Sequence, residues 1–372
     1  MLVGVPKEIK NHECRVGMTP PGVRELIQLG HEVIIERSAG SGIGIEDSQY
    51  ESAGAKIVTD ADEIFKSAEL VVKVKEPQPE EIVMLRKNQT LFTYLHLAPD
   101  EEQTEGLLQS GATAIAYETV TDDKGGLPLL APMSEVAGRM SVQAGAIGLE
   151  IKNGGRGVLL GGVPGVASGK VVVIGGGVVG TNAAFIATGM GASVTILDKS
   201  QSRMAELDFQ FQSLITTLYS TSQTIEETVL DADLVIGAVL VPGAEAPKLV
   251  TRNLVKKMKR GSVIVDVAID QGGCIETSRP TTHENAYYSD EGVVHYCVTN
   301  MPGGVARTST FALNNATLPY IITLAQNNIV DALRDNKHLA NGLNIHQGLL
   351  TQRAVAHAQN RTYTSPQNAL AN

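Results

Sequence analysis

The fold of this chain is decided by the stretch Val171-Val172-Val173-Ile174-Gly175-Gly176-Gly177-Val178-Val179-Gly180. Its β-branched first half predicts a buried strand over 170–174, and the residues that follow, 181–190, predict a helix. Between them, Gly175, Gly177 and Gly180 form the pattern G-x-G-x-x-G. Glycines at these positions allow a tight turn, let the backbone approach a pyrophosphate and let the helix pack closely on the sheet. The stretch therefore predicts a dinucleotide-binding strand–turn–helix unit.

The residue after the next predicted strand, 193–197, is Asp198. A carboxylate there accepts hydrogen bonds from the adenosine ribose diol and repels a 2′-phosphate, which predicts NAD rather than NADP. Lys199 and Arg203 lie nearby, and either could tolerate a phosphate. No charged residue occurs between 171 and 197, but six glycines interrupt this stretch. We therefore interpret it as strand, helix and strand, not as one membrane-spanning helix.

The same alternation of strands and helices extends in both directions. Further strands are predicted at 234–239, 262–267 and 293–298, and earlier in the chain at 2–6, 32–36, 70–75, 90–95 and 112–118. Polar amphipathic segments at 21–29 and 60–67 predict helices between the early strands. This spacing predicts an α/β protein with two Rossmann-like, mostly parallel sheets.

The 372 residues suggest two or three domains, at roughly 150 residues per domain. The glycine-dense segment 154–169 predicts a loop before the second sheet. Long helices are expected at 134–152, with Ser134 as N-cap after Pro132, and at 317–337. We expect these helices to bridge a discontinuous substrate domain, 1–133 plus 308–372, and an NAD-binding domain, 134–307. The segment 363–372 is expected to be a loose tail.

The composition excludes several classes of protein. Apolar residues make up 43% of the chain, too many for intrinsic disorder, and the net charge of −10 opposes binding to nucleic acid through bulk charge. Cys14, Cys274 and Cys297 show no paired spacing, so neither a disulfide scaffold nor a metal site is predicted. The first residues lack the pattern of a secretory signal, and a cytoplasmic protein without a membrane segment is expected.

Four chemically capable residues follow predicted strands, where open α/β sheets bind ligands. Arg15 could pair with a carboxylate, Lys75 could polarise a carbonyl oxygen, and His96 could transfer protons. Asp270 could activate water or an amine. Taken singly, each has an ordinary interpretation: Arg15 as a surface residue, Lys75 or its neighbour Lys73 as a solvated edge charge, His96 as a satisfied core or surface histidine, and Asp270 as a turn residue. Taken together, they suit hydride transfer on a small anionic substrate.

Seven further segments carry a wider similarity, namely Val3-Gly4-Val5-Pro6-Lys7-Glu8, Glu13-Cys14-Arg15-Val16, Val72-Lys73-Val74-Lys75-Glu76-Pro77, Thr93-Tyr94-Leu95-His96-Leu97-Ala98, Pro132-Met133-Ser134-Glu135-Val136-Ala137-Gly138, Asp266-Val267-Ala268-Ile269-Asp270-Gln271-Gly272-Gly273 and Asn300-Met301-Pro302-Gly303. With the glycine pattern, they closely resemble the alanine dehydrogenase family. That family also includes the nucleotide-binding subunit of proton-translocating transhydrogenase. The resemblance runs over essentially the whole chain.

This resemblance implies reversible oxidative deamination of L-alanine to pyruvate and ammonia with NAD, in a hexameric enzyme. It implies Arg15 and Lys75 as substrate ligands and His96 and Asp270 as the catalytic pair. The cofactor contacts that it implies are Ser134, Gly175, Gly177, Val178, Val179, Gly180, Asp198, Arg203, Ser220, Val239, Leu240, Val267, Ala268, Ile269, Asp270, Arg279, Val298, Thr299, Asn300 and Met301.

Two other classes of protein remain as alternatives. A transhydrogenase subunit is disfavoured because no membrane segment follows and because that branch generally lacks the pairing of His96 with Asp270. A non-catalytic NAD(H) sensor would bind the nucleotide without turnover. Saccharopine and lysine dehydrogenases share the general plan but fit the motifs less well.

Overall fold

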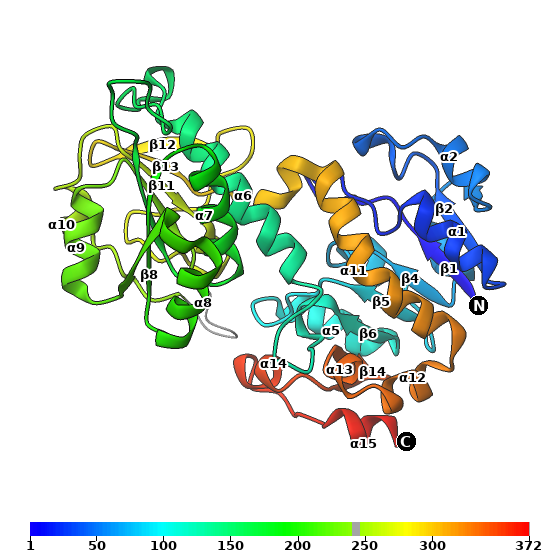
Figure 1. The fold of residues 1–372 in the computed structure, drawn as a ribbon. Helices are drawn as coiled ribbons and strands as arrows, with labels where there is room; N and C mark the ends of the chain where they lie inside the picture. Colours follow the sequence, from blue (N-terminus) through cyan, green and yellow to red (C-terminus); the bar gives the residue numbers. More distant parts are fainter. Residues whose placement is uncertain (240–245, 372) are drawn as a thin grey trace. The chain divides into compact units, whose positions relative to one another are not determined.

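A computed structural model of the protein describes residues 1–239 and 246–371. The chain divides into two compact units, with Met1–Met133 and Val305–Asn372 in unit 1 and Ser134–Gly304 in unit 2. In Figure 1, unit 1 carries the blue-to-cyan and the orange-to-red parts of the chain, and unit 2 is green to yellow. Each unit contains its own sheet with helices, which confirms the predicted α/β class.

Unit 1 is built around an eight-stranded sheet, counted over the described residues. Its strands are β1 Leu2–Val5, β2 Glu32–Glu36, β3 Lys56–Val58, β4 Leu70–Val72, β5 Thr90–Thr93, β6 Thr113–Ala116, β14 Leu343–His346 and β15 Leu349–Leu350. Its helices are α1 Pro20–Gln28, α2 Asp47–Ser52, α3 Ala61–Ser67, α4 Pro79–Ile82, α5 Glu101–Ser110, α11 Ala306–Gln326, α12 Ile329–Asp335, α13 Lys337–Ala340, α14 Arg353–Ala358 and α15 Pro366–Leu370.

The order of the strands in unit 1 is β15-β14-β6-β5-β4-β1-β2-β3. The six strands from β3 to β6 are parallel, whereas β14 and β15 are antiparallel additions from the C-terminal part of the chain. Strands β1 and β4 are neighbours. The chain leaves β1 toward β2 and leaves β4 toward β5, so the two connections run in opposite directions along the sheet. Ligands of doubly wound folds bind at such a switch point, outside the carboxyl ends of the strands.

Unit 2 contains, in the part of the chain that the structure describes, a seven-stranded sheet in the order β12-β13-β11-β10-β7-β8-β9. The strands are β7 Lys170–Ile174, β8 Ser193–Asp198, β9 Ile215–Tyr219, β10 Leu234–Gly237, β11 Val263–Asp266, β12 Tyr287–Asp290 and β13 Val293–Tyr296. The helices are α6 Ala131–Gly148, α7 Val178–Gly189, α8 Gln201–Phe211, α9 Ser222–Leu230 and α10 Arg252–Val255. All pairings are parallel except that of the edge strand β12.

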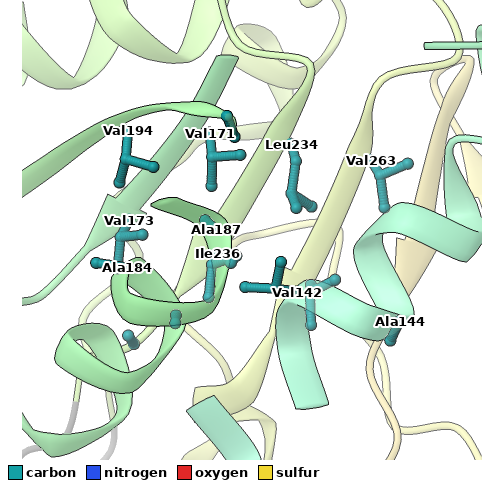
Figure 2. Packing of buried hydrophobic residues seen from close by; sticks show 14 of the residues in the cluster. Val142, Ala144, Val171, Val173, Ala184, Ala187, Val194, Leu234, Ile236 and Val263 are labelled. Atoms are coloured by element: carbon teal, nitrogen blue, oxygen red, sulfur yellow. The ribbon is translucent and has the colours of Figure 1, made fainter. Parts of the chain in front are cut away.

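The central strands of unit 2 are buried on both faces, as their continuous Val/Ile runs predict. Alternate residues of β7 point to opposite sides, with Val171 and Val173 in one apolar cluster and Val172 and Ile174 in another. The first cluster also contains Val142 from α6 and Ala187 from α7, seen with its neighbours in Figure 2. This packing holds the turn between β7 and α7 in place.

Several helix predictions were wrong in their bounds. Helix α6 begins at Ala131, so Ser134 lies inside the helix and not at its N-cap. The segment 317–337 is not one helix, because α11 ends at Gln326 and Asn328 caps a new helix by accepting the N–H of Val330. Helix α11 lies wholly in unit 1, whereas α6 runs across the boundary between Met133 and Ser134.

The predicted loose tail is also wrong. Ser365 caps α15 by accepting the N–H of Asn368. Pro366 occupies the first turn, where a backbone N–H would have no partner within the helix, so its missing N–H costs nothing. Ala369 and Leu370 are buried. The C-terminal segment therefore packs against unit 1 as a short helix.

Two further features lie outside the site. Asp100 caps α5 by accepting the N–H of Gln103. Within residues 1–239 and 246–371, no helix combines the length and the apolar character that crossing a membrane requires.

Candidate active site

The unit 1 residues singled out from the sequence all lie beyond the carboxyl ends of neighbouring strands. Arg15 follows β1, Lys75 follows β4 and His96 follows β5. Strands β1, β4 and β5 are adjacent in the sheet, so the topology brings these three residues to one edge at the switch point.

Arg15 is buried, not a surface residue, with 2% of its surface exposed. Its Nε and Nη2 donate to the carboxylate of Glu13 at 2.7 and 2.5 Å, and its backbone N–H donates to the same Oε1 at 3.0 Å. Nη1 lies 3.1 Å from the Met133 sulfur. Burial opposes the charge, but Glu13 holds the pKa of Arg15 above its usual value, so the guanidinium stays charged.

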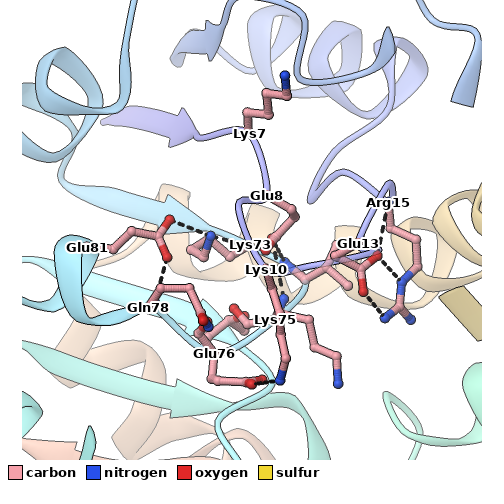
Figure 3. A network of polar contacts seen from close by, with 12 residues as sticks. Lys7, Glu8, Lys10, Glu13, Arg15, Lys73, Lys75, Glu76, Gln78 and Glu81 are labelled. Atoms are coloured by element: carbon pink, nitrogen blue, oxygen red, sulfur yellow. Dashed lines mark hydrogen bonds and ion pairs between the residues drawn. The ribbon is translucent and has the colours of Figure 1, made fainter. Parts of the chain in front are cut away.

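Lys73 is fully buried, which excludes its interpretation as a solvated edge charge. Its ammonium group lies 2.6 Å from Glu81 and 3.2 Å from Glu8 (Figure 3). Burial alone would lower the pKa of Lys73, but the two carboxylates raise it above its ordinary value. The sequence did not reveal this, because Glu8 lies 65 residues away along the chain.

Lys75 is partly buried, and its backbone is held on both sides. Glu8 accepts the N–H of Val74 at 2.7 Å and of Lys75 at 3.3 Å. The hydroxyl of Thr93 donates to the carbonyl oxygen of Lys75 at 2.8 Å. Strand β4 ends at Val72 and not at the predicted residue 75, although Lys73 N–H still donates to the Phe92 carbonyl oxygen at 3.1 Å.

His96 has an exposed side chain and a left-handed backbone, with φ of 50°. Glu118 stabilises this conformation by accepting the His96 N–H at 2.6 Å, and its Oε1 lies 3.9 Å from Nδ1. The ring also lies parallel to that of Tyr94, with centroids 5.8 Å apart. Strain at a non-glycine residue is typical of functional sites, because the surroundings fix a side chain in an unusual direction.

The glycine turn of unit 2 has the geometry of a pyrophosphate cradle. Gly175 has φ of 103°, and a Cβ on Gly180 would lie 1.9 Å from the Gly175 carbonyl oxygen. A Cβ on Gly177 would meet nothing within 4 Å, so open space lies above this residue. Gly177 is also the N-cap of α7, and no side chain caps the helix. Uncapped N–H groups and an open approach fit a bound anion.

Asp198 ends β8 beside this turn. Its Oδ2 accepts the N–H of Gly176 at 2.7 Å, and its Oδ1 accepts the N–H of Ser200 at 2.8 Å. Arg203 is engaged by the turn as well, since it donates to the Gly176 carbonyl and to the Thr181 hydroxyl, both at 2.7 Å. It also pairs with Glu206. The hydrogen bonds of Arg203 thus stabilise the glycine turn.

The remaining predicted cofactor contacts of unit 2 lie near carboxyl ends of strands. Ser220 follows β9, Val239 follows β10, residues 267–270 form a 3-10 turn after β11, and 298–301 follow β13. Asp270 is exposed within its turn. Further members are Val178 and Val179 in the first turn of α7, Ser134 in the first turns of α6, and Arg279, whose guanidinium lies over the Tyr288 ring at 4.1 Å. Leu240 lies outside the described residues.

Neither the buried cysteines nor the possible metal ligands form a second site among the described residues. Cys274 and Cys297 are buried, and burial raises the pKa of both thiols, as expected of structural cysteines. Over the described ranges, no group of three His, Cys, Asp or Glu side chains has the arrangement to hold a metal ion.

Three acidic residues at the site were given no role from the sequence: Glu8, Glu13 and Glu118. Each accepts the backbone N–H of a predicted site residue, respectively Lys75, Arg15 and His96. Glu13 stands two residues before Arg15, which is the one local signal that pairs an acid with a site cation.

Comparisons with known proteins agree with this arrangement. The sequence model described as "Alanine dehydrogenase/PNT, N-terminal domain" matches residues 4–137, and that of the C-terminal domain matches 141–353. The alanine dehydrogenase of Halomonas elongata is 61% identical over 96% of this chain and 96% of its own. A solved L-alanine dehydrogenase is 55% identical, with a TM-score of 0.94 over 97% of this chain and 99% of that one. A solved transhydrogenase from Sinorhizobium meliloti is 26% identical, with a TM-score of 0.82 over 95% and 100%.

Proposed function

The chain belongs to the alanine dehydrogenase/PNT family, and on this premise we propose that it oxidatively deaminates L-alanine to pyruvate and ammonia with NAD, reversibly. The observation that carries the proposal is the 61% identity with an alanine dehydrogenase over nearly the whole of both chains. A transhydrogenase is similar in structure, but at 26% identity it is a far more distant relative.

The glycine turn fits a nicotinamide dinucleotide. The N-terminus of α7 and the space above Gly177 would receive the pyrophosphate, and Asp198 the adenosine ribose. Segments 267–270 and 298–301, with Ser134, Ser220, Val239, Leu240 and Arg279, would complete the contacts. A nicotinamide held by these residues would supply the hydride acceptor for the Cα hydrogen of alanine.

The residues proposed to bind and activate the substrate are Arg15, Lys75 and His96 of unit 1 and Asp270 of unit 2. Arg15 holds the substrate carboxylate through a charged, planar fork, and Lys75 binds the carboxylate or the carbonyl oxygen. Loss of hydride and a proton from alanine leaves an imine, to which water adds at carbon. Asp270 takes the proton from this water, and His96 moves protons to and from the nitrogen and oxygen as ammonia leaves. The reverse sequence forms alanine from pyruvate.

Preference for NAD follows from Asp198 and Arg203. A carboxylate has about four acceptor positions, so Asp198 can accept ribose hydroxyls beside its two backbone N–H donors, while its charge repels a 2′-phosphate. The guanidinium of Arg203 could bind such a phosphate, but it already donates to Gly176 and Thr181 and pairs with Glu206.

Replacing Asp198 with Ala is expected to raise the Kd of NADH roughly 10- to 150-fold, since a hydrogen bond to a charged group contributes about 1.5–3 kcal/mol. The KM of L-alanine measured at saturating NAD should stay close to that of the unaltered protein. Fluorescence titration with NADH and with NADPH checks this. A rise confined to the alanine KM would contradict the ribose role.

The activity itself is tested by initial rates of NADH formation from L-alanine and NAD at alkaline pH. NADP, L-lactate and L-lysine serve as parallel substrates. Turnover with L-alanine and NAD alone is expected. Tight NADH binding without turnover of any substrate would instead indicate a nucleotide sensor or a subunit of a larger assembly.

We also propose a homohexamer in the cytoplasm, as implied by the family. Sedimentation at several protein concentrations tests the assembly. A monomer at all concentrations would contradict it.

A further inference from the structure

We propose that Glu13 is a positioning residue that aims the guanidinium of Arg15 at the substrate carboxylate. The proposal rests on the role of Arg15 in the proposed function and extends it to a residue of the same segment, Glu13, to which no role was assigned.

The first argument is geometric. A guanidinium offers two edges that can each bind a carboxylate in a bidentate manner. Glu13 takes the edge formed by Nε and Nη2, at 2.7 and 2.5 Å (Figure 3). The other edge, Nη1 with Nη2, is the one suited to a second carboxylate. There, Nη1 lies 3.1 Å from the Met133 sulfur, and a thioether is a weak acceptor that a carboxylate readily displaces.

The second argument concerns rigidity. The Oε1 of Glu13 accepts both the backbone N–H and the Nε–H of Arg15, at 3.0 and 2.7 Å. One oxygen therefore fixes the main chain and the side chain of the same residue. An arginine side chain has many rotamers. These two hydrogen bonds restrict the rotamers of Arg15 before the substrate arrives, so substrate binding costs less conformational entropy.

The third argument concerns charge. Arg15 is 2% exposed and Glu13 is 6% exposed, so the pair is withdrawn from water. An unpaired guanidinium there would turn toward another partner or toward solvent, because a buried charge without a partner is costly. Glu13 keeps the guanidinium in place while the substrate is absent. Its negative charge opposes an incoming anion, so the proposal requires orientation to outweigh this repulsion.

The test compares Glu13→Gln with the unaltered enzyme. We expect the kcat/KM for pyruvate to fall roughly 100-fold, the cost of a misplacement near 1 Å, mainly through KM, with the Kd of NADH unchanged. Binding of oxamate, which shares the carboxylate and carbonyl of pyruvate but is not reduced, to the NADH-loaded enzyme should weaken in parallel. A KM for pyruvate that stays the same or falls would overturn the proposal.

Asp233→Asn is the matched control. Asp233 is a buried carboxylate of unit 2 that pairs with Arg156 at 2.7 Å and accepts the backbone N–H of Lys170. It should lower the thermal stability without changing the pyruvate KM or oxamate binding. An equal loss of pyruvate affinity in this variant would show that the effect of Glu13→Gln is general destabilisation, and would overturn the positioning role.

Glu13→Asp keeps the test decisive if Glu13→Gln does not fold. It retains the charge but is one methylene shorter, so it cannot reach Nε and Nη2 together on the present backbone. A KM for pyruvate raised about tenfold is expected, and an unchanged KM overturns the proposal. Absence of L-alanine turnover in the unaltered protein would instead defeat the proposed function, whereas oxamate binding would still report on Glu13.

Discussion

Replacing Asp270 with Asn is expected to lower kcat for L-alanine oxidation by about 10²–10⁴-fold, the range that a general acid or base contributes. Asparagine has nearly the same shape but cannot take a proton from the water that adds to the imine. The fold should be unaffected, because Asp270 is exposed. Its 3-10 turn is held by Asp266, which accepts the N–H of Ala268.

Steady-state rates of NADH formation measure this change, with NADH titration as the check on cofactor binding. Asp208→Asn removes an exposed carboxylate from α8 and serves as the control, for which unaltered turnover is expected. Near-normal turnover in Asp270→Asn would remove Asp270 from the mechanism.

The sheets of both units could be predicted because parallel strands buried on two faces need continuous apolar runs. Val171 to Ile174 and Leu234 to Ile236 are such runs, and both are strands. Strands β3, β12, β14 and β15 were not predicted. Strand β9, Ile215–Tyr219, was not predicted either, although its first three residues, Ile215, Thr216 and Thr217, are β-branched.

The site was partly predictable for a different reason. A residue after a strand is placed by topology alone, so Arg15, Lys75 and His96 could be assigned to one edge of a sheet. The groups that hold them could not. Burial of an ionised residue depends on partners far along the chain, as with Lys73 and Glu8, and a sequence pattern does not report such contacts. Residues with a chemically capable side chain at a strand end can thus be predicted from sequence, whereas the residues that hold them in place cannot.

Replacing Gly177 with Ala is expected to separate nucleotide binding from folding. Its φ of −68° and ψ of −161° are open to alanine, and the new methyl would meet no protein atom within 4 Å. Such a substitution typically stabilises a protein by about 0.4–1 kcal/mol, so the Tm should hold or rise. The methyl would nevertheless occupy the space proposed for the pyrophosphate. Overpacking there costs about 1–3 kcal/mol, or roughly 5- to 150-fold in the Kd of NADH.

Gly180→Ala provides the contrast, because its Cβ would lie 1.9 Å from the Gly175 carbonyl oxygen. This variant should lose stability as well as NADH affinity. Calorimetric unfolding and NADH titration of both variants give the comparison. Retained NADH affinity in Gly177→Ala would mean that the pyrophosphate lies elsewhere, whereas a stable protein without NADH affinity can be explained only by a ligand that needs the space beside Gly177.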